Sequence, residues 1–541
     1  MGMSVVGIQL ILESVPVSNT YSLTKQRTKQ LRILATRANS MDIKSTVAFV
    51  AAAAAWTMSS GNSSTDTTAK STGAPTQCPV TGHKVEGSSG CPFSQGLPLP
   101  DPGHRCDPNS VDEFKIPDVP PLTDKQREVI KATAPVLAEH GVTITTHFYK
   151  NMIRAHPELR DVFSETAQKL GHQPRALASA VYAYAVNIDD LTPLLPVVDR
   201  IAYKHTSLHI VAEQYGIVGK HLIQAIVDIL GDAVTPEIGD AWYNGYWNLA
   251  KIFIQRERDI YSAAVQAGGW EGWRPFKVAK RVKESDEITS FYLKPAEDTG
   301  KPIPTYHPGQ YLGVSLNIPA LGHKQARQYS LSDAPNGEYY RISVKREDGV
   351  AIPTPENPEV PNHPGWISNV LHKDLHEGDL IDVAPPYGDF FYEPSTVTPN
   401  APLVLLSAGV GQTALLSILK SQIDNADKKI TYATVAKNEK THAFGNYIRD
   451  LEKSHKNLTF KVFYSSPGDK AVQGAHFDHH GRMNLEKIKD SLYLDDDATE
   501  YFLCGPAAFM TDKLKELSAL GVDEKRVHLE LFSAGELPSG N

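Results

Sequence analysis

His205 shares one helical face with three apolar residues. On a helix it lies seven, four and three residues after Val198, Ile201 and Ala202, so the four side chains point the same way. An imidazole that points into an apolar cavity between helices can be the fifth ligand of a heme iron. On this pattern alone a core histidine bonded to a backbone carbonyl is the commoner case, and both interpretations stay open.

Two polar residues favour the iron-binding interpretation. Tyr215 stands ten residues after His205, and Glu257 continues a stripe of four-residue steps from Leu249 and Phe253, so its carboxylate should face inward. A buried carboxylate is costly unless it has a partner. An imidazole held by a tyrosine and a glutamate supplies that partner, and the pair pushes electron density towards the iron.

A glycine-rich turn offers a second kind of chemistry. It consists of Gly409, Val410, Gly411, Gln412 and Thr413, between a short apolar run and a predicted helix. Such a turn lets the backbone approach a pyrophosphate at the N-terminus of a helix. It lacks the G-x-G-x-x-G spacing of the common dinucleotide fingerprint, so alone it is a weak signal.

The elements that must position these residues fall into three classes along the chain. Residues 122–262 have helical periodicity, opened by a Thr-x-x-Gln capping box at Thr123, and predict an all-α domain. Residues 270–395 alternate in short runs, which predicts an antiparallel β-barrel domain. Residues 400–541 alternate short buried strands with helices, which predicts an α/β domain with a parallel sheet. We therefore expect a multidomain protein with these boundaries.

Composition excludes several classes of function. The 541 residues are 41% hydrophobic and 21% charged, which is typical of a globular protein in water. The formal net charge is −8 with no long basic stripe, which argues against nucleic acid as a partner. Four cysteines, three of them before residue 110, give no disulfide framework and favour a reducing compartment.

Residues 1–121 predict a targeting or disordered extension. The first 60 residues hold six lysines and arginines against two acidic residues, a balance typical of an organelle presequence. An uninformative extension and a secretory signal stay open as alternatives. Within the extension, Cys78-Pro79 and Cys91-Pro92 look like short motifs through which some proteins bind regulatory heme, although a dipeptide is weak evidence. We expect a cytoplasmic or mitochondrial location.

Taken together, these patterns make residues 122–541 similar to the flavohemoglobin family, in which a globin precedes a ferredoxin-reductase-like half. The resemblance implies that His205 is the proximal iron ligand and that Tyr215 and Glu257 are its charge-relay pair. Lys204 matches the residue beside the ligand.

The distal side of the heme follows from the same resemblance. Tyr149 matches the distal tyrosine, Gln173 and Leu177 match the helix that crosses above the iron, and Phe163 matches the phenylalanine that wedges against the porphyrin. The Tyr149 hydroxyl, assisted by Gln173, can donate a hydrogen bond to negative charge on a gas molecule held there. An ordinary core tyrosine is the alternative.

The candidate FAD site resembles the R-x-Y-S/T signature of ferredoxin-reductase-like flavoproteins. Its residues are Arg327, Gln328, Tyr329 and Ser330. The arginine can present a forked cation to a pyrophosphate, the tyrosine an aromatic face to the flavin, and the serine a hydroxyl near the flavin N5. Tyr311 ends a Pro-Gly-Gln-Tyr run that precedes the signature, and Gly365-x-x-Ser368 opens a helix whose free N–H groups suit a phosphate. These flanks favour an FAD site over a chance strand.

The resemblance also completes the nicotinamide site. Cys504, Gly505 and Pro506 stand between a strand and a helix and match the second half of the family's pocket, although Cys504 could be only a small buried residue. Leu531 and Phe532 belong to a Glu-x-Phe sequence whose aromatic ring, in the family, covers the flavin and must yield to nicotinamide.

The implied activity is that of a nitric oxide dioxygenase with heme b, FAD and NADH or NADPH as cofactors. Hydride arrives as an electron pair and iron accepts single electrons, and a flavin connects the two because it takes the pair and releases it singly. The small-molecule partners would be NO, O₂ and NAD(P)H, and we expect a monomer without an obligate protein partner. An oxygen- or redox-sensing globin and a general NAD(P)H-dependent heme or ferric reductase are the alternatives.

Three features depart from the family. Ala414 follows the glycine-rich turn where the family often has proline, residues 350–364 form a Pro-rich insertion of open role, and the long extension has no counterpart in the compact family form. The choice between NADH and NADPH also stays open, since Lys437 could meet a 2′-phosphate or be solvated.

Overall fold

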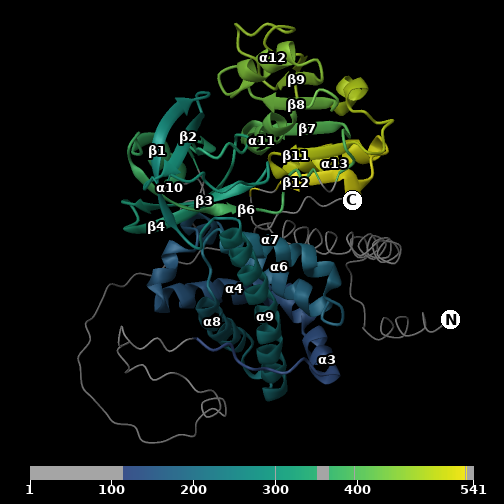
Figure 1. Cartoon of the computed structure of the whole chain (residues 1–541). Helices are drawn as coiled ribbons and strands as arrows, with labels where there is room; N and C mark the ends of the chain where they lie inside the picture. Colours follow the sequence, from purple (N-terminus) through teal and green to yellow (C-terminus); the bar gives the residue numbers. More distant parts are fainter. Residues whose placement is uncertain (1–113, 299, 350–364, 395–396, 531, 533–541) are drawn as a thin grey trace, which may run out of the picture.

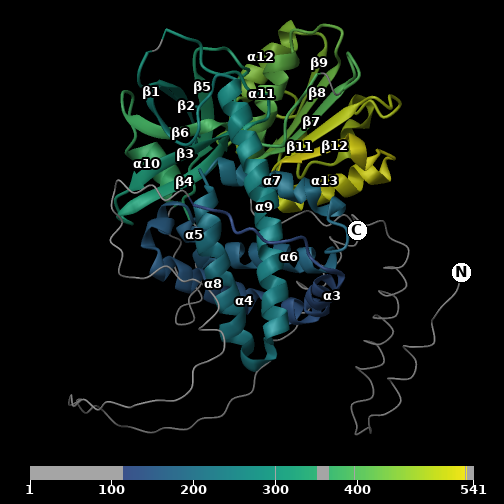
Figure 2. The same ribbon diagram turned by 60° about the horizontal axis from the view of Figure 1, so that its bottom comes forward.

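The chain is described from a computed structural model that covers residues 114–298, 300–349, 365–394, 397–530 and 532. A helical part lies below two sheets that stand side by side, as the views in Figures 1 and 2 agree. One sheet is antiparallel and the other parallel, so the three predicted fold classes are confirmed. The Cys-Pro pairs, the insertion at 350–364 and Leu531 lie outside the described residues, and the predictions made for them stay predictions.

The helical part begins at the predicted capping box. The Thr123 side chain accepts from Gln126 N, and the Gln126 side chain accepts from Thr123 N, which confirms that prediction. The α-helices are α3 (Asp124–Ala132), α4 (Ala134–Ala155), α5 (Glu165–Lys169), α6 (His172–Val186), α7 (Leu195–Thr206), α8 (Ala212–Leu230) and α9 (Pro236–Gln266). Short 3₁₀ turns are η2 (Pro157–Asp161), η3 (Thr192–Leu194) and η4 (Gly231–Ala233).

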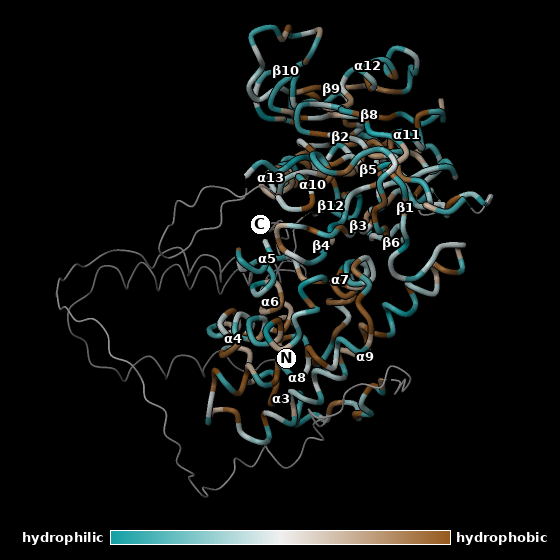
Figure 3. The backbone as a smooth tube through the Cα atoms, turned by 90° about the vertical axis from the view of Figure 1, so that its left-hand side faces the viewer, coloured by the Kyte–Doolittle hydropathy of each residue, from teal (hydrophilic) through white to brown (hydrophobic). Residues whose placement is uncertain are grey.

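Apolar faces hold the helices together. Ile144, Phe148 and Met152 recur at four-residue steps along α4, and all three are buried against α8. Figure 3 shows hydrophobic and hydrophilic stretches alternating along α8 and α9, as expected for helices with one buried face. Packing of these faces fixes the relative positions of α4, α6, α7, α8 and α9, the helices that carry most of the candidate heme residues.

The antiparallel sheet has the strand order β4-β3-β6-β1-β2-β5. Its strands are β1 (Arg274–Lys283), β2 (Ile288–Pro295), β3 (Tyr311–Ile318), β4 (His323–Ser330), β5 (Tyr340–Lys345) and β6 (Leu380–Tyr387). An antiparallel bridge between Leu331, just after β4, and Ile342 of β5 joins the two edge strands, so the sheet closes on itself. Helix α10 (Trp366–Lys373) lies beside β3 and β4.

The parallel sheet has the strand order β10-β9-β8-β7-β11-β12. Its strands are β7 (Leu403–Ala408), β8 (Ile430–Ala436), β9 (Leu458–Tyr464), β10 (His479–His480), β11 (Glu500–Cys504) and β12 (Val527–Glu530). Its helices are α11 (Gln412–Gln422), α12 (Gly445–Ser454) and α13 (Ala507–Ala519), with 3₁₀ turns η5 (Gly409–Gly411), η6 (Leu485–Ser491) and η7 (Glu524–Arg526).

The strand order places a switch point at β7. The chain moves from β7 to β8 on one side and later returns to β11 on the other, so the carboxyl ends of β7 and β11 are neighbours. Ligands of open α/β sheets bind at such a point.

None of the helices in the described ranges has the length and apolar composition that a membrane span needs.

Candidate functional site

His205 lies in the last turn of α7 and is held through its Nδ1 atom. Nδ1 lies 2.7 Å from Glu257 Oε1 and 3.1 Å from the Tyr215 hydroxyl. The same hydroxyl donates to Glu257 Oε1 over 2.6 Å. Glu257 is 3% exposed, so the prediction that its carboxylate faces inward is confirmed. The three side chains predicted from different helices therefore form one hydrogen-bonded group.

This group leaves the other imidazole nitrogen for a ligand. Because Glu257 accepts, Nδ1 carries the proton, and Nε2 then bears the lone pair. Among the described residues Nε2 has no protein partner, and the His205 side chain is 34% exposed. Burial, and then the Glu257 charge, raise the pKa of Tyr215 well above its usual range, so its hydroxyl stays a donor. A single imidazole with a free, electron-rich Nε2 fits the axial ligand of a heme iron.

A segment ahead of α3 supports this proximal group. Val119 is buried in a cluster with Tyr215 and Trp247, and the Phe114 ring lies 6.4 Å from the Trp247 ring. Lys251 of α9 donates to the Val119 carbonyl over 3.0 Å. The sequence pattern placed Phe114 and Val119 in the extension and did not predict that this segment packs beside Tyr215.

The predicted distal residues also come together. Tyr149 of α4 is 9% exposed, and its ring meets the Phe163 ring edge to face at 5.4 Å. Leu177 of α6 packs against the same cluster. Burial raises the pKa of Tyr149, and its hydroxyl has no hydrogen-bond partner within the described ranges, so it is an available donor. Gln173 of α6 does not bond Tyr149, since its Oε1 atom accepts from Gln168 over 2.6 Å.

Lys204, in the last turn of α7, interacts electrostatically with the last strand of the parallel sheet. Glu530 at the end of β12 is 8% exposed. Burial raises its pKa to about 8, and Lys204 acts in the opposite direction. Burial also lowers the pKa of Lys204, against the attraction of Glu530. The two residues therefore favour each other's charged forms at the junction of α7 and β12. Phe532, two residues further on, is 46% exposed.

The end of α7 docks directly on the flavin signature. Gln328 Nε2 donates to the Ser207 hydroxyl over 2.9 Å. Gly313 of β3 pairs with Gln328 in the sheet, and a Cβ atom at Gly313 would lie 2.2 Å from the Ser207 carbonyl oxygen. Only glycine admits this approach. The candidate iron ligand thus stands two residues from a side chain that bonds the signature.

The remaining flavin residues lie on β4 and its neighbour. Tyr311 pairs with Ser330 in the β3–β4 register, and Tyr329 packs half-buried against the sheet core. Burial lowers the pKa of Arg327, whose Nη1 donates to the Ala326 carbonyl over 2.6 Å. No carboxylate among the described residues pairs with Arg327, so its guanidinium can bind an anion. These residues fit a flavin dinucleotide.

Gly365 and Ser368 lie where α10 begins. The Ser368 hydroxyl donates to the Gly365 carbonyl over 3.3 Å and accepts from Glu347 N over 3.2 Å. Asn369, one residue on, has a buried Oδ1 atom without a partner in the described chain. The Ser368 hydroxyl is thus engaged locally, while the start of α10 keeps one unmatched polar atom.

The two nicotinamide motifs are in contact at the switch point. A Cβ atom at Gly411 would lie 2.1 Å from the Cys504 carbonyl oxygen and 2.8 Å from Gly505 N. Gly409 has a φ of 56°, which glycine adopts without strain. Pro506 is the N-cap of α13.

The last two side chains of the glycine-rich turn, Gln412 and Thr413, are buried. Gln412 is 1% exposed, and its Oε1 atom is buried without a partner among the described residues. Thr413 Oγ1 donates to the Val410 carbonyl over 2.9 Å, and Ala414 is fully buried in α11. Burial, and then Glu530, raise the pKa of Cys504 well above its usual range, so the thiol is neutral. The backbone cradle and the unmatched amide oxygen fit a dinucleotide.

Sequence reasoning missed several residues that join these sites. Ser207 and Gln325 bind the helical part to the antiparallel sheet, and Asp333 and Lys420 bind the two sheets to each other. Gln325 Nε2 donates to the Arg160 and Phe163 carbonyls, and its Oε1 accepts from Glu165 N. Each partner is distant in sequence, and no local pattern marks such a contact.

Comparisons with known proteins agree with this arrangement. Residues 146–252 match the globin family model, and residues 405–515 match the model of the oxidoreductase NAD-binding domain. The chain is 44% identical over 412 residues to the flavohemoprotein of Rhizobium meliloti strain 1021, which covers 76% of this chain and 98% of that protein. It is 42% identical over 413 residues to the flavohemoprotein of Bacillus subtilis strain 168, covering 76% and 97%.

A solved structure extends the likeness to three dimensions. The flavohemoglobin of Malassezia yamatoensis, described with bound FAD and heme, is 28% identical and superposes with a TM-score of 0.63. The match covers 76% of this chain and 100% of that one. The helical part, the antiparallel sheet and the parallel sheet are all included in these matches, which cover nearly the whole length of each relative. This chain therefore belongs to the flavohemoprotein family.

Proposed function

We propose that this chain is a nitric oxide dioxygenase. In the balanced reaction, two molecules of NO and two of O₂ react with one NAD(P)H to give two nitrate ions, one NAD(P)⁺ and one proton. Membership of the flavohemoprotein family supports the proposal. So do the hydrogen bonds that join His205, Tyr215 and Glu257, and the close approach of Gly411 to the Cys504 backbone.

One observation carries the proposal: the three candidate sites are joined by direct contacts in a single polypeptide. Ser207, two residues after His205, bonds Gln328 of the flavin signature over 2.9 Å. Asp333, three residues after Ser330, is ion-paired to α11, which follows the glycine-rich turn. A sensor globin has no need of this second and third site, and a plain reductase has no need of the first.

When bound, heme supplies an iron that changes oxidation state, and FAD and NAD(P)H supply a two-electron carrier and a hydride donor. We assign His205 to hold the iron, with Glu257 and Tyr215 keeping the proton on Nδ1. We assign Arg327 to the FAD pyrophosphate, and Gly409 and Gly411 to the nicotinamide dinucleotide.

The distal side is assigned to Tyr149. Its hydroxyl is protonated and lacks a partner among the described residues, so it can donate to a gas molecule held above His205. We assign Phe163 and Leu177, which pack on the same cluster as Tyr149, to the apolar wall of that side. We further propose the functional boundaries 122–262, 270–395 and 400–541, a monomer, and a cytoplasmic or mitochondrial location supported by the basic, acid-poor first 60 residues.

The experiment is NO consumption by the purified holoprotein. We expect rapid NO loss that requires both O₂ and NAD(P)H and yields one nitrate per NO. Tyr149→Phe removes one charge-assisted hydrogen bond, so we expect faster O₂ release and roughly a tenfold to hundredfold loss of NO consumption. Stopped-flow mixing of the oxygenated protein with NO measures both steps.

Two outcomes distinguish the alternatives. Slow or absent nitrate formation with fast NAD(P)H-dependent reduction of ferric chelates or quinones would favour a general reductase. Absence of both activities, with O₂ binding retained, would favour a sensor. Unchanged NO turnover in Tyr149→Phe would remove that residue from the mechanism while leaving the activity in place.

A further inference from the structure

We propose that Asp333 is a positioning residue for hydride transfer, a buried anion that fixes the flavin strand against the nicotinamide helix. The inference rests on the proposed function, because it assumes that hydride passes from NAD(P)H to a flavin on β4. It adds a residue that belongs to none of the three binding motifs.

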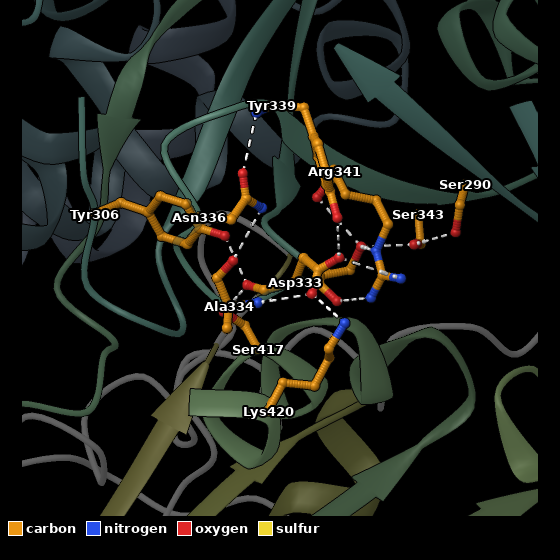
Figure 4. Close-up of polar contacts among 11 residues, drawn as sticks. Ser290, Tyr306, Asp333, Ala334, Asn336, Tyr339, Arg341, Ser343, Ser417 and Lys420 are labelled. Carbon is orange, nitrogen blue, oxygen red and sulfur yellow. Dashed lines mark hydrogen bonds and ion pairs between the residues drawn. The ribbon is translucent and has the colours of Figure 1, made fainter. Parts of the chain in front are cut away.

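Asp333 stands between the two motifs in space. It lies three residues after Ser330, the last residue of β4. Its partners Ser417 and Lys420 are on α11, the helix that continues the glycine-rich turn. Figure 4 shows Lys420 and Ser417 reaching Asp333 from one side and Arg341 reaching it from the other.

Asp333 is 4% exposed, and its carboxylate has one cationic partner on a strand of the antiparallel sheet and one on a helix beside the parallel sheet. Lys420 of α11 forms an ion pair with Oδ1, and Arg341 Nη1 of β5 lies 3.5 Å from Oδ2. The Tyr339 hydroxyl donates to Oδ2 over 3.1 Å, and Ala334 N donates to Oδ1 over 2.9 Å. The anion therefore satisfies donors from β5, from its own turn and from α11.

The backbone of Asp333 is held as firmly as its side chain. Its carbonyl oxygen accepts from the Ser417 hydroxyl and from the Tyr306 hydroxyl, each over 2.6 Å. Ser417 is fully buried. Helix α11 thus holds the turn after β4 through one hydrogen bond, from Ser417, and one ion pair, from Lys420.

Arg341 extends the network to a second helix of the parallel sheet. Its guanidinium lies 5.6 Å from the ring centroid of Phe444, the N-cap of α12, and 5.9 Å from the Tyr292 ring. It also donates to the Ser332 hydroxyl and carbonyl. A loss of the Asp333 charge would leave Arg341 and Lys420 as neighbouring cations without their shared counter-ion.

Such a loss would alter geometry more than a surface ion pair could. Exposed pairs contribute little to stability, whereas removing one partner of a buried pair leaves an uncompensated charge. The flavin residues Tyr329 and Ser330 immediately precede the turn that holds Asp333, and the nicotinamide residue Gly411 immediately precedes α11, the helix that carries Ser417 and Lys420. A misplacement of about 1 Å between reacting groups can cost roughly a hundredfold in rate.

The test is anaerobic flavin reduction by NAD(P)H in the purified holoprotein, followed by stopped-flow absorbance. We expect Asp333→Asn and Lys420→Met each to slow flavin bleaching by at least roughly tenfold, with a larger primary isotope effect from nicotinamide deuterated at the transferred position. Lys420→Arg keeps the cation and should stay near wild type. Electron passage from chemically reduced flavin to the iron should not change in any of these variants.

A matched control separates positioning from general destabilisation. Asp478 accepts from Arg449 over 2.5 Å and from Val462 N over 2.7 Å, all within the parallel sheet and its helices. Asp478→Asn should lower thermal stability and leave flavin reduction at the wild-type rate.

Each remaining outcome has one meaning. Equal slowing in Asp478→Asn, or wild-type flavin reduction in folded, FAD-loaded Asp333→Asn, would overturn the positioning role. If Asp333→Asn does not fold, the contrast between Lys420→Met and Lys420→Arg decides, because Lys420 is 22% exposed and easier to replace. A wild-type protein whose flavin NAD(P)H fails to reduce would instead refute the proposed function.

Discussion

His205 illustrates how single residues define the chemistry of this protein. Its imidazole would be an ordinary core group if its Nδ1 proton met a backbone carbonyl. Here Nδ1 meets a carboxylate that is itself bonded to a tyrosine, so the ring gains electron density and keeps Nε2 for a ligand. Buried charge is tolerated at Glu257 because two donors satisfy one of its oxygens.

A buried histidine, His442, gives a pH prediction at this scale. Burial, and then Arg449, lower the pKa of His442 to about 4, while its ordinary value is 6.5. Between these values the unfolded chain binds the proton and the folded chain does not, so the free energy of unfolding falls as pH falls. We expect a loss of about 3 kcal/mol across this window that His442→Gln abolishes.

Urea unfolding measured above pH 6.5 and again near the folded pKa of about 4 checks this prediction. The Tyr464 hydroxyl, 3.1 Å from His442 Nδ1, remains available to bond the glutamine side chain. If the free energy of unfolding of His442→Gln fell with pH as steeply as that of the wild type, groups other than His442 would be responsible for the fall.

At the scale of elements, α7 connects the candidate heme site to the antiparallel sheet. Its last turn carries the candidate iron ligand, and its end bonds β4 and blocks any side chain at Gly313. Behind it, the segment ahead of α3 packs on α8 and α9 beside Tyr215. The proximal relay is thus supported from both ends.

Phe114→Ala tests the support from this segment. The half-buried ring contacts Trp247 and lies close to Gly216, next to Tyr215. Its removal should destabilise the helical part by about 1–2 kcal/mol, less than a fully buried phenylalanine would. We also expect a shift in the iron–histidine stretching frequency, because Tyr215, which bonds His205, loses the packing that Phe114 provides.

Thermal unfolding and resonance Raman spectroscopy measure the two effects. The exposed neighbour provides the control, since Lys115→Ala should change neither. Identical spectra for the two variants would mean that the segment only adds stability.

At the scale of the whole molecule, three structural parts are joined by direct contacts. The helical part meets the antiparallel sheet at Ser207 and Gln325, and the two sheets meet at Asp333. Lys204 and Glu530 add an electrostatic attraction between the first part and the last. Under the proposed function, we expect electron transfer between the parts to depend on these contacts.

Gly313→Ala tests the first junction. A Cβ atom 2.2 Å from the Ser207 carbonyl must push α7 away from β3. We expect the flavin-to-iron step to slow by roughly tenfold or more, because reacting groups lose their alignment. Hydride transfer to the flavin, measured in the same stopped-flow trace, is the internal control and should be unchanged. Equal slowing of both steps would indicate general damage.

Local sequence determined much of this protein. The capping box at Thr123, the inward face of Glu257 and the three fold classes were all predicted from periodicity and local chemistry, because helix and strand patterns repeat within a few residues. The motif residues of all three sites were also named from sequence.

Only the tertiary structure decided how these sites are joined. Ser207 and Gln328 are separated by 121 residues, and Asp333 and Ser417 by 84, so no local pattern could pair them. Asp333 belongs to none of the sequence motifs, and it is a buried counter-ion only because residues of β5 and α11 close around it. Composition and spacing determine the type of each element and the chemistry available to its side chains. Desolvation and contacts between distant elements determine which of those side chains are paired, buried or left available to a ligand.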